Sequence, residues 1–197
     1  MDFSRPTTSQ PGQPDSSPPI VALTGFMAAG KSTVGRVLAS LLHWRFLDLD
    51  CEIECRSKLG IHELFATYGE SHFRQLEGDA LRSVLEQVSS PTVIALGGGT
   101  FIESRSADLL RSFGAQVVFL DIAVEELLRR CRAASERSAQ NPRPLAADAQ
   151  AFCALYAQRL PHYRKAELIV NTAGKAAEQV AREIEAALHL AAGKHGT

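Results

Sequence analysis

A glycine-rich segment near the start of the chain carries the residues best suited to chemistry. Residues 25–32 read GFMAAGKS and match the pattern G-x-x-x-x-G-K-[ST] in full. The glycines at 25 and 30 let the backbone fold into a nest of inward-pointing N–H groups. In such a nest Lys31 reaches the β- and γ-phosphates, and the hydroxyl of Ser32 ligates Mg²⁺. An apolar run precedes the segment and a helical pattern follows it, so the sequence predicts a nucleoside triphosphate site.

Two aspartates end the next expected strand, in the segment FLDLD at 46–50. Strand alternation would put Asp48 and Asp50 on one face of the chain, at the carboxyl edge where open α/β sheets bind ligands. One carboxylate could lie near the metal, and the other could orient or deprotonate an attacking hydroxyl. The alternative is a solvated strand end, because D-x-D alone is a weak signal.

Two arginines are candidates for holding an anionic substrate. Arg74 and Glu77 are three residues apart on an expected helix and could form a surface pair. Alternatively, Arg74 faces the site as a bidentate clamp and Glu77 holds its guanidinium. Arg159, in the segment RLPHYR, could offer a second guanidinium or cap the carboxyl end of its own helix.

Two loops complete the set of candidate segments. Gly97, Gly98 and Gly99 follow an expected strand, where three glycines allow a ligand to approach the backbone closely or simply form a loose turn. Residues 135–144 read SERSAQNPRP, a polar stretch that contains Arg143. We interpret this stretch as a mobile lid that closes over phosphates and excludes water.

These segments require a scaffold in which strands and helices alternate. The apolar runs predict strands at 20–24, 45–48, 92–96, 116–121 and 167–171. Helical spacing predicts helices at 31–42, 69–88, 103–113, 124–134, 147–160 and 175–190. Right-handed crossovers then give a three-layer α/β/α fold around a five-stranded parallel sheet.

Length and composition limit the classes of protein. The 197 residues predict one domain, at 20–192, with a flexible carboxyl terminus at 193–197. Residues 1–19 hold five of the nine prolines, which predicts a disordered tail. An organelle transit peptide is disfavoured, because the tail has two aspartates and one arginine. The net charge of −1 argues against nucleic-acid binding. The sequence contains no run of 18 apolar residues, so we expect no membrane span.

The four cysteines do not indicate a disulfide framework in a chain of this length. Cys51 and Cys55 are four residues apart and would share a helix face. A zinc site would have to recruit His62 or His72 at arbitrary spacing. We therefore expect reduced thiols, as in a cytosolic protein.

Taken together, seven motifs resemble the shikimate kinase family over residues 21–188. In order they are GFMAAGKSTVGR, FLDLD, G-I-x-E-L-F, GE-x-x-FR-x-x-E, LGGGT, RPL and RLPHYR. The resemblance implies the P-loop fold of the nucleoside monophosphate kinases with a mobile lid. It also implies ATP- and Mg²⁺-dependent phosphorylation of the 3-hydroxyl of shikimate, a step of aromatic amino acid biosynthesis. A cytoplasmic monomer is expected.

The resemblance also implies residue roles. Asp50 would hold the substrate hydroxyl and act as its base, while Lys31 and Arg143 would stabilise the phosphates during transfer. Ser32 would ligate Mg²⁺, with Asp48 near the metal through water. The implied substrate site consists of Asp50, Arg74, Gly97, Gly98, Gly99 and Arg159. The implied ATP site consists of Ala28, Ala29, Gly30, Lys31, Ser32, Thr33 and Arg143.

Three departures from the family pattern concern the phosphate site. Ala28 stands where the family usually has glycine, and its Cβ would shift the phosphate cradle if the position needs a positive φ. Ala146 follows RPL where a second leucine is common, and the segment before Arg143 is longer than in many members. The arginine that assists Arg143 is left open among Arg130, Arg132 and Arg137.

Two alternative functions share parts of this pattern. A related P-loop kinase could act on gluconate or on a nucleotide, although the arginine pair at 74 and 159 fits a carboxylate and no base pocket is evident. A non-catalytic relative could bind nucleotide only, but it should have lost Lys31, Asp50 or an arginine of the clamp. All four residues are present.

Overall fold

Five short apolar segments form one parallel sheet within the described part of the chain. In this computed structural model the described residues are 18–137 and 148–190. The strands are β1 (Ile20–Thr24), β2 (Arg45–Asp48), β3 (Thr92–Ala95), β4 (Gln116–Asp121) and β5 (Leu168–Asn171). Their order is β2-β3-β1-β4-β5, and every pairing is parallel. β1 is central and fully buried, so its carboxyl end opens in the middle of the sheet edge.

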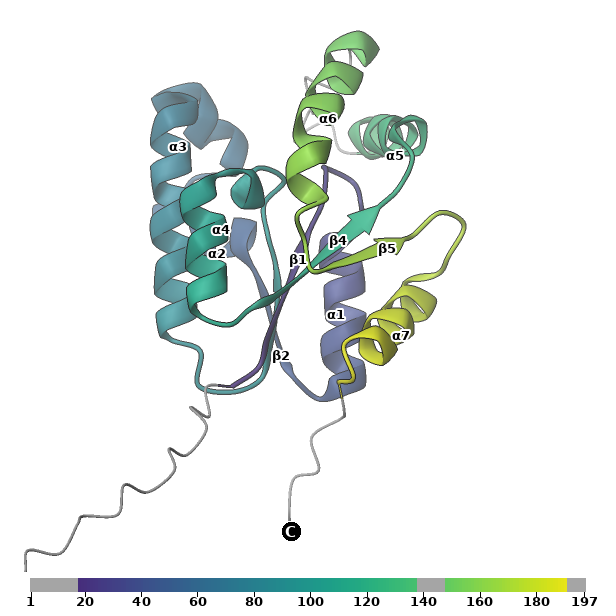
Figure 1. Ribbon diagram of the computed structural model, residues 1–197. Coiled ribbons are helices and arrows are strands. Elements are labelled where there is room, and N and C mark those ends of the chain that lie inside the picture. The colour runs from purple at the N-terminus through teal and green to yellow at the C-terminus, as the bar shows by residue number, and fades with distance from the viewer. Residues whose placement is uncertain (1–17, 138–147, 191–197) are drawn as a thin grey trace, which may run out of the picture.

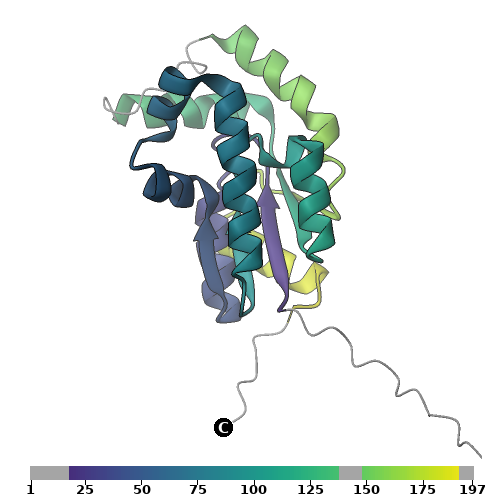
Figure 2. The ribbon, with the colours of Figure 1, turned by 90° about the vertical axis from the view of Figure 1, so that its left-hand side faces the viewer.

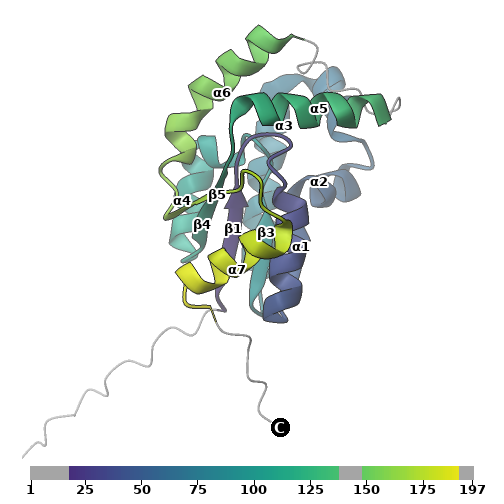
Figure 3. The same cartoon turned by 90° about the vertical axis from the view of Figure 1, so that its right-hand side faces the viewer.

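Helices cover both faces of the sheet (Figure 1). One face packs against α1 (Lys31–Leu42) and α7 (Ala177–Ala187), which lie in front in Figure 3. The other packs against α2 (Leu49–Ser57), α3 (Ile61–Glu86) and α4 (Ser104–Ser112), as Figure 2 shows for α3 and α4. The short η1 (Thr100–Ile102), α5 (Val124–Arg137) and α6 (Ala149–Tyr163) lie toward the carboxyl ends of the strands. The predicted three-layer α/β/α fold is confirmed.

Two hydrophobic cores form, one on each side of the sheet. The first surrounds Leu38 of α1 and Ile184 of α7, and it extends to α5 and α6. The second surrounds Leu81 of α3 and Leu110 of α4. In β1 the side chains alternate between the cores, because Leu23 joins the first and Ala22 the second.

The second strand ends at Asp48, as predicted, and the structure differs from the prediction just after it. Residues 49–57 form α2, which was not among the predicted helices, although Cys51 and Cys55 were expected to share a helix face. The side chain of Asp48 caps α2 by accepting hydrogen bonds from the backbone N–H groups of Asp50, at 3.2 Å, and Cys51, at 3.5 Å. The inferred period-two alternation of the aspartates was therefore wrong, because the chain turns into a helix between them.

Several predicted helix boundaries also shift: α6 ends at Tyr163 rather than at residue 160, and α7 ends at Ala187 rather than at residue 190. α3 begins at Ile61 rather than at Gly69, and Gly69 marks a kink inside it, with φ 79° and ψ 174°. Glu63 closes the amino end of α3 by accepting from the Gly60 N–H at 2.8 Å. α5 continues to Arg137, so the first residues of the predicted loop are helical.

Several expectations lie outside the described residues. These are the tail at 1–17, the carboxyl-terminal residues 191–197, and the segment 138–147 with Arg143 and Ala146. Pro19 is described, and its carbonyl oxygen accepts a hydrogen bond from the Thr92 N–H at 3.0 Å. Among the described helices, none is both long and apolar enough to cross a membrane.

Candidate active site

The loop between β1 and α1 folds into a compact turn at the carboxyl end of the central strand. Gly25, Ala28 and Gly30 all have positive φ, at 145°, 62° and 93°. The ammonium group of Lys31 donates to the carbonyl oxygens of Gly25, at 2.9 Å, and Phe26, at 3.1 Å. The first N–H groups of α1 point out of the helix here and have no partner within it. The loop and helix together form a site suited to an anion.

Ala28 has the positive φ that glycine adopts more readily at this position. Its φ of 62° lies in the left-handed region, where an L side chain costs about 1–2 kcal/mol. The loop therefore adopts its turn despite the Cβ. Ala29, beside it, is buried, and Thr33 is exposed on the first turn of α1.

Two oxygen donors meet where α1 begins and β2 ends. Ser32 Oγ donates to Asp48 Oδ2 at 2.5 Å, and the second oxygen of Asp48 caps α2. A hydroxyl and a carboxylate are hard donors of the kind Mg²⁺ prefers. Among the residues that the structure describes, no group of three His, Cys, Asp or Glu could hold a metal ion. The pair therefore fits a Mg²⁺ whose other ligands are water and phosphate oxygens.

Asp50 lies in the first turn of α2 and is largely buried near Lys31. Burial raises its pKa from 3.8 to about 6, Lys31 opposes this rise, and the charges of Asp48 and Glu77 add to it. Gly97 packs directly against this carboxylate: a Cβ there would lie 2.9 Å from Asp50 Oδ1 and 2.5 Å from Glu77 Oε1. The Asp50 carboxylate is therefore a stronger base than an ordinary aspartate, and it lies near Lys31 of the phosphate loop.

A buried carboxylate holds Arg74 in place. Arg74 Nη1 donates to Glu77 Oε2 at 2.7 Å, and its Nη2 donates to Glu70 Oε1 at 3.1 Å. Glu77 is only 1% exposed, and its second oxygen accepts from Thr100 Oγ1 at 2.6 Å. The alternative of a surface pair between Arg74 and Glu77 is therefore wrong. Gly99 lies against the guanidinium, where a Cβ would collide with it.

Arg159 approaches from the opposite side, on α6. Its Nη1 donates to the carbonyl oxygen of Gly98 at 3.4 Å, and its guanidinium carbon lies 5.8 Å from the centre of the Phe26 ring. The same Gly98 oxygen accepts a hydrogen bond from the Tyr163 hydroxyl. Because α6 continues to Tyr163, Arg159 lies one turn before the helix end and its guanidinium contacts the glycine loop.

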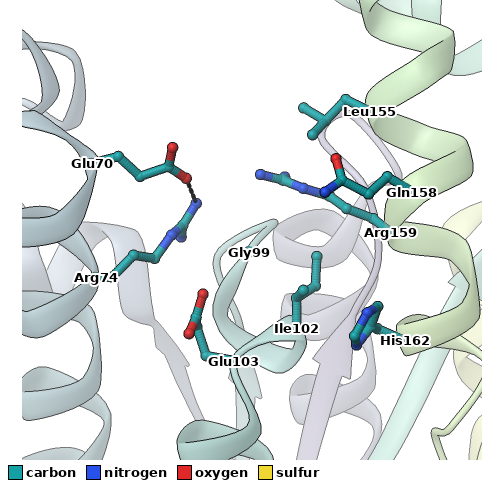
Figure 4. A pocket seen from close by; sticks show the side chains of 9 residues that line it. All are labelled: Glu70, Arg74, Gly99, Ile102, Glu103, Leu155, Gln158, Arg159 and His162. Carbon is teal, nitrogen blue, oxygen red and sulfur yellow. Dashed lines mark hydrogen bonds and ion pairs between the residues drawn. The ribbon is translucent and has the colours of Figure 1, made fainter.

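A cavity of about 240 Å³ separates the two arginines. Figure 4 shows Arg74 and Arg159 pointing into it from opposite walls, with the Glu103 carboxylate below them. Its lining residues are Glu70, Arg74, Gly99, Ile102, Glu103, Leu155, Gln158, Arg159 and His162. Two guanidinium groups facing one small space can bind a carboxylate.

The structure thus brings most of the predicted site residues together at one sheet edge. Arg143 lies outside the described residues, as does the side chain of Arg137. Of the other candidates to assist Arg143, Arg130 donates to Glu126 at 2.8 Å, and Arg132 is exposed. Sequence reasoning missed the roles of Thr100 and Tyr163, although both belong to the motifs LGGGT and RLPHYR.

Comparison with known proteins decides the family. The family model described as shikimate kinase matches residues 27–189. The chain belongs to the shikimate kinase family. It is 45% identical to a shikimate kinase of Geobacter sulfurreducens, over 83% of this chain and 87% of that protein. It is 42% identical to one of Geobacter metallireducens, over 83% and 88%.

Solved structures of the shikimate kinase family agree with this assignment. The shikimate kinase of Acinetobacter baumannii in complex with shikimate superposes with a TM-score of 0.76 at 32% identity, over 88% of this chain and 94% of that one. The enzyme of Aquifex aeolicus gives 0.74 at 32% identity, over 86% and 96%. A gluconokinase from Sinorhizobium meliloti gives 0.55 at 18% identity, which shows a shared fold alone.

Proposed function

We propose that the protein transfers the γ-phosphoryl group of ATP to the 3-hydroxyl of shikimate, giving shikimate 3-phosphate and ADP. Membership of the family supports the substrates. One observation carries the assignment to this chain's own residues: Arg74 and Arg159 face each other across a small cavity, and the Arg159 guanidinium also lies over the ring of Phe26 in the loop after β1. A substrate that bears one carboxylate and several hydroxyls matches this arrangement.

In this proposal the two guanidinium groups bind the substrate carboxylate. Glu77 already orients Arg74 by accepting a hydrogen bond from it. The Thr100 hydroxyl in turn holds the Glu77 carboxylate by donating to its second oxygen. Preorganised donors lose little conformational entropy on binding. Gly99 lines the cavity without a side chain, so the substrate can approach the backbone there. At Gly97 and Gly99 the missing Cβ also leaves room for Asp50, Glu77 and Arg74.

Asp50 then acts on the hydroxyl that receives the phosphoryl group. A carboxylate with a pKa of about 6 is ionised at neutral pH, and it is a stronger base than an ordinary aspartate. It orients the hydroxyl and accepts its proton.

The phosphates of ATP occupy the nest formed by residues 28–33. Lys31, which donates to two loop carbonyls in the structure, would exchange them for phosphate oxygens. When bound, Mg²⁺ would neutralise part of the phosphate charge. Ser32 and Asp48 would hold the ion. Arg143 of the RPL motif, outside the described residues, is proposed to contact the phosphates.

We also propose that residues 20–192 act as one monomeric kinase domain in the cytoplasm, without nucleic-acid or membrane partners. The parallel sheet with a core on each face supports a single domain. The net charge of −1 supports the absence of a nucleic-acid partner.

The test is ATP turnover with Mg²⁺ in the presence of shikimate, gluconate or a nucleoside monophosphate, and with no acceptor. We expect ATP turnover only when shikimate is the acceptor. Lys31→Ala should abolish it without loss of folding, because the point charge on the phosphates is removed. Preference for gluconate would indicate the related kinase, and nucleotide binding without turnover would indicate a non-catalytic relative.

A further inference from the structure

The carbonyl oxygen of Gly98 is the meeting point of two side-chain donors from α6. It accepts from Tyr163 Oη and, at the longer distance of 3.4 Å, from Arg159 Nη1. Arg159 and Tyr163 are four residues apart on one helix, so they present their donors to the same side. A carbonyl oxygen has two lone pairs and can accept both bonds at once.

The two donors differ in how firmly they are held. Tyr163 is completely buried, and its ring stacks on that of Phe119 with centroids 5.2 Å apart. Burial raises its pKa to about 12, so the hydroxyl stays protonated and remains a donor. Arg159 is only partly buried, and its long side chain lines the substrate cavity.

To bind a carboxylate, the Arg159 guanidinium must point its N–H donors toward the substrate. A bidentate guanidinium–carboxylate pair uses two N–H groups in one plane. A pair that uses Nη1 would weaken or break the bond from this nitrogen to the Gly98 carbonyl. The Gly98 carbonyl is partly buried. Leaving it without a donor from the protein would cost free energy, which would be subtracted from substrate binding.

We infer that Tyr163 is a positioning residue for the substrate: its hydroxyl keeps the Gly98 carbonyl satisfied, so that Arg159 can turn to the substrate carboxylate at little cost. This role rests on the proposed function, because it requires Arg159 to bind the substrate. Tyr163 is fully buried and is not among the residues that line the cavity. Without its hydroxyl, Arg159 would remain drawn to Gly98.

Tyr163→Phe tests this role through steady-state kinetics with shikimate. The ring is kept and the donor removed, so the KM for shikimate should rise about tenfold while kcat changes little. Tyr156→Phe is the matched control. Tyr156 is on the same helix, and its hydroxyl makes only long contacts, at 3.5 Å to Asp121 and 3.3 Å to the Ile122 carbonyl. Its KM should stay within about twofold of the wild-type value.

A double-mutant cycle separates positioning from a general structural role. When Arg159 is replaced by alanine, no guanidinium remains to be released, so adding Tyr163→Phe should change shikimate affinity by less than about twofold. Fully additive effects in this cycle would overturn the inference. An unchanged KM in a folded Tyr163→Phe protein would overturn it too. Failure of the wild-type enzyme to phosphorylate shikimate would instead refute the proposed function.

A measurement on the wild-type protein holds even if Tyr163→Phe does not fold. The chain has three tyrosines, so the ¹³Cζ resonance of Tyr163 can be assigned through the Tyr68→Phe and Tyr156→Phe variants. The deuterium isotope shift on this carbon reports exchange of the hydroxyl proton. We expect the proton to be protected both before and after shikimate saturates the site. A hydroxyl that exchanges freely in the shikimate complex would overturn the inference.

Discussion

At the scale of single residues, charge and burial are set against each other. Asp50 is held where burial disfavours its ionised form, and the neighbouring Asp48 and Glu77 charges add to this effect. Glu77 is buried as well, yet it has direct donors in Arg74 and Thr100. The two carboxylates therefore differ: Asp50 has a raised pKa, while Glu77 is paired with Arg74 and holds its guanidinium in place.

Substitutions of the proposed base and of the proposed arginine clamp should alter different kinetic constants. Asp50→Asn keeps the size of the side chain but removes the proton acceptor, so kcat should fall by about 10² or more while shikimate still binds. Arg74→Lys keeps the charge and loses the two-pronged donor set, so the KM for shikimate should rise by about tenfold. Steady-state kinetics of both variants check this. An Asp50→Asn enzyme with most of its kcat would show that Asp50 is not the base.

The raised pKa of Asp50 also predicts a pH-dependent stability. The native state binds this proton more tightly than the unfolded state, so the contribution of Asp50 to stability is fully present below about pH 4 and is lost as the pH rises through about 6. The difference between 3.8 and about 6 corresponds to about 3 kcal/mol. Asp50→Asn should therefore raise the free energy of unfolding by about 1–3 kcal/mol at pH 8 and not at pH 4. Urea denaturation with EDTA and without nucleotide measures it. Equal stability gains at both pH values would contradict the prediction.

At the scale of elements, the ends of secondary structure position the chemistry. β2 stops at Asp48, whose side chain starts α2, and this start places Asp50 on the first turn. The segment after β3 passes between Asp50, Glu77 and Arg74 because its three glycines leave room. Ser32, Asp48 and Asp50 thus lie at a strand end or in the first turn of the helix that follows a strand.

Two glycine substitutions should have opposite consequences. Gly97→Ala would place a Cβ 2.5 Å from the buried Glu77 carboxylate, so the variant should lose about 1–3 kcal/mol of stability and most of its activity. Gly78→Ala, within α3, would meet nothing within 4 Å. It should gain about 0.5–1 kcal/mol and keep full activity. Thermal unfolding and turnover of both variants test the contrast. Equal effects would mean that the packing at Gly97 is not what excludes a side chain.

At the scale of the whole molecule, one sheet joins two separate cores. Leu38 lies in the core between the sheet and α1, and Leu81 lies in the core beneath α3. Both side chains are fully buried. Since β1 contributes side chains to both cores, loss of one core should loosen the sheet that supports the other.

Leu38→Ala and Leu81→Ala test this arrangement. Each should lower the free energy of unfolding by about 2–5 kcal/mol, because a buried leucine leaves a cavity. Each variant should still unfold in one cooperative transition, followed by circular dichroism and by tryptophan fluorescence of Trp44. Two separate transitions, or transitions that differ between the probes, would show that the cores are independent.

The amino-acid sequence by itself determined the sheet, the helices on both of its faces, and the phosphate loop. These follow from local signals: apolar runs, helical spacing, and glycines at fixed intervals. The sequence missed α2 because Leu49–Ser57 is short and mostly polar, with little apolar periodicity. It also placed the start of α3 at Gly69, since a glycine resembles a boundary where the structure has a kink.

Only the tertiary structure decided how the candidate residues act on one another. Whether Arg74 and Glu77 lay on the surface depended on what covers Glu77. Thr100, which is 23 positions away in the sequence, donates a hydrogen bond to the buried Glu77 carboxylate. Whether Asp50 was basic depended on burial beside Lys31. Whether Arg159 and Tyr163 met Gly98, over 60 residues distant in sequence, depended on the packing of α6 against the sheet edge. Burial and electrostatic coupling arise from neighbours in space, and no local pattern in the chain encodes them.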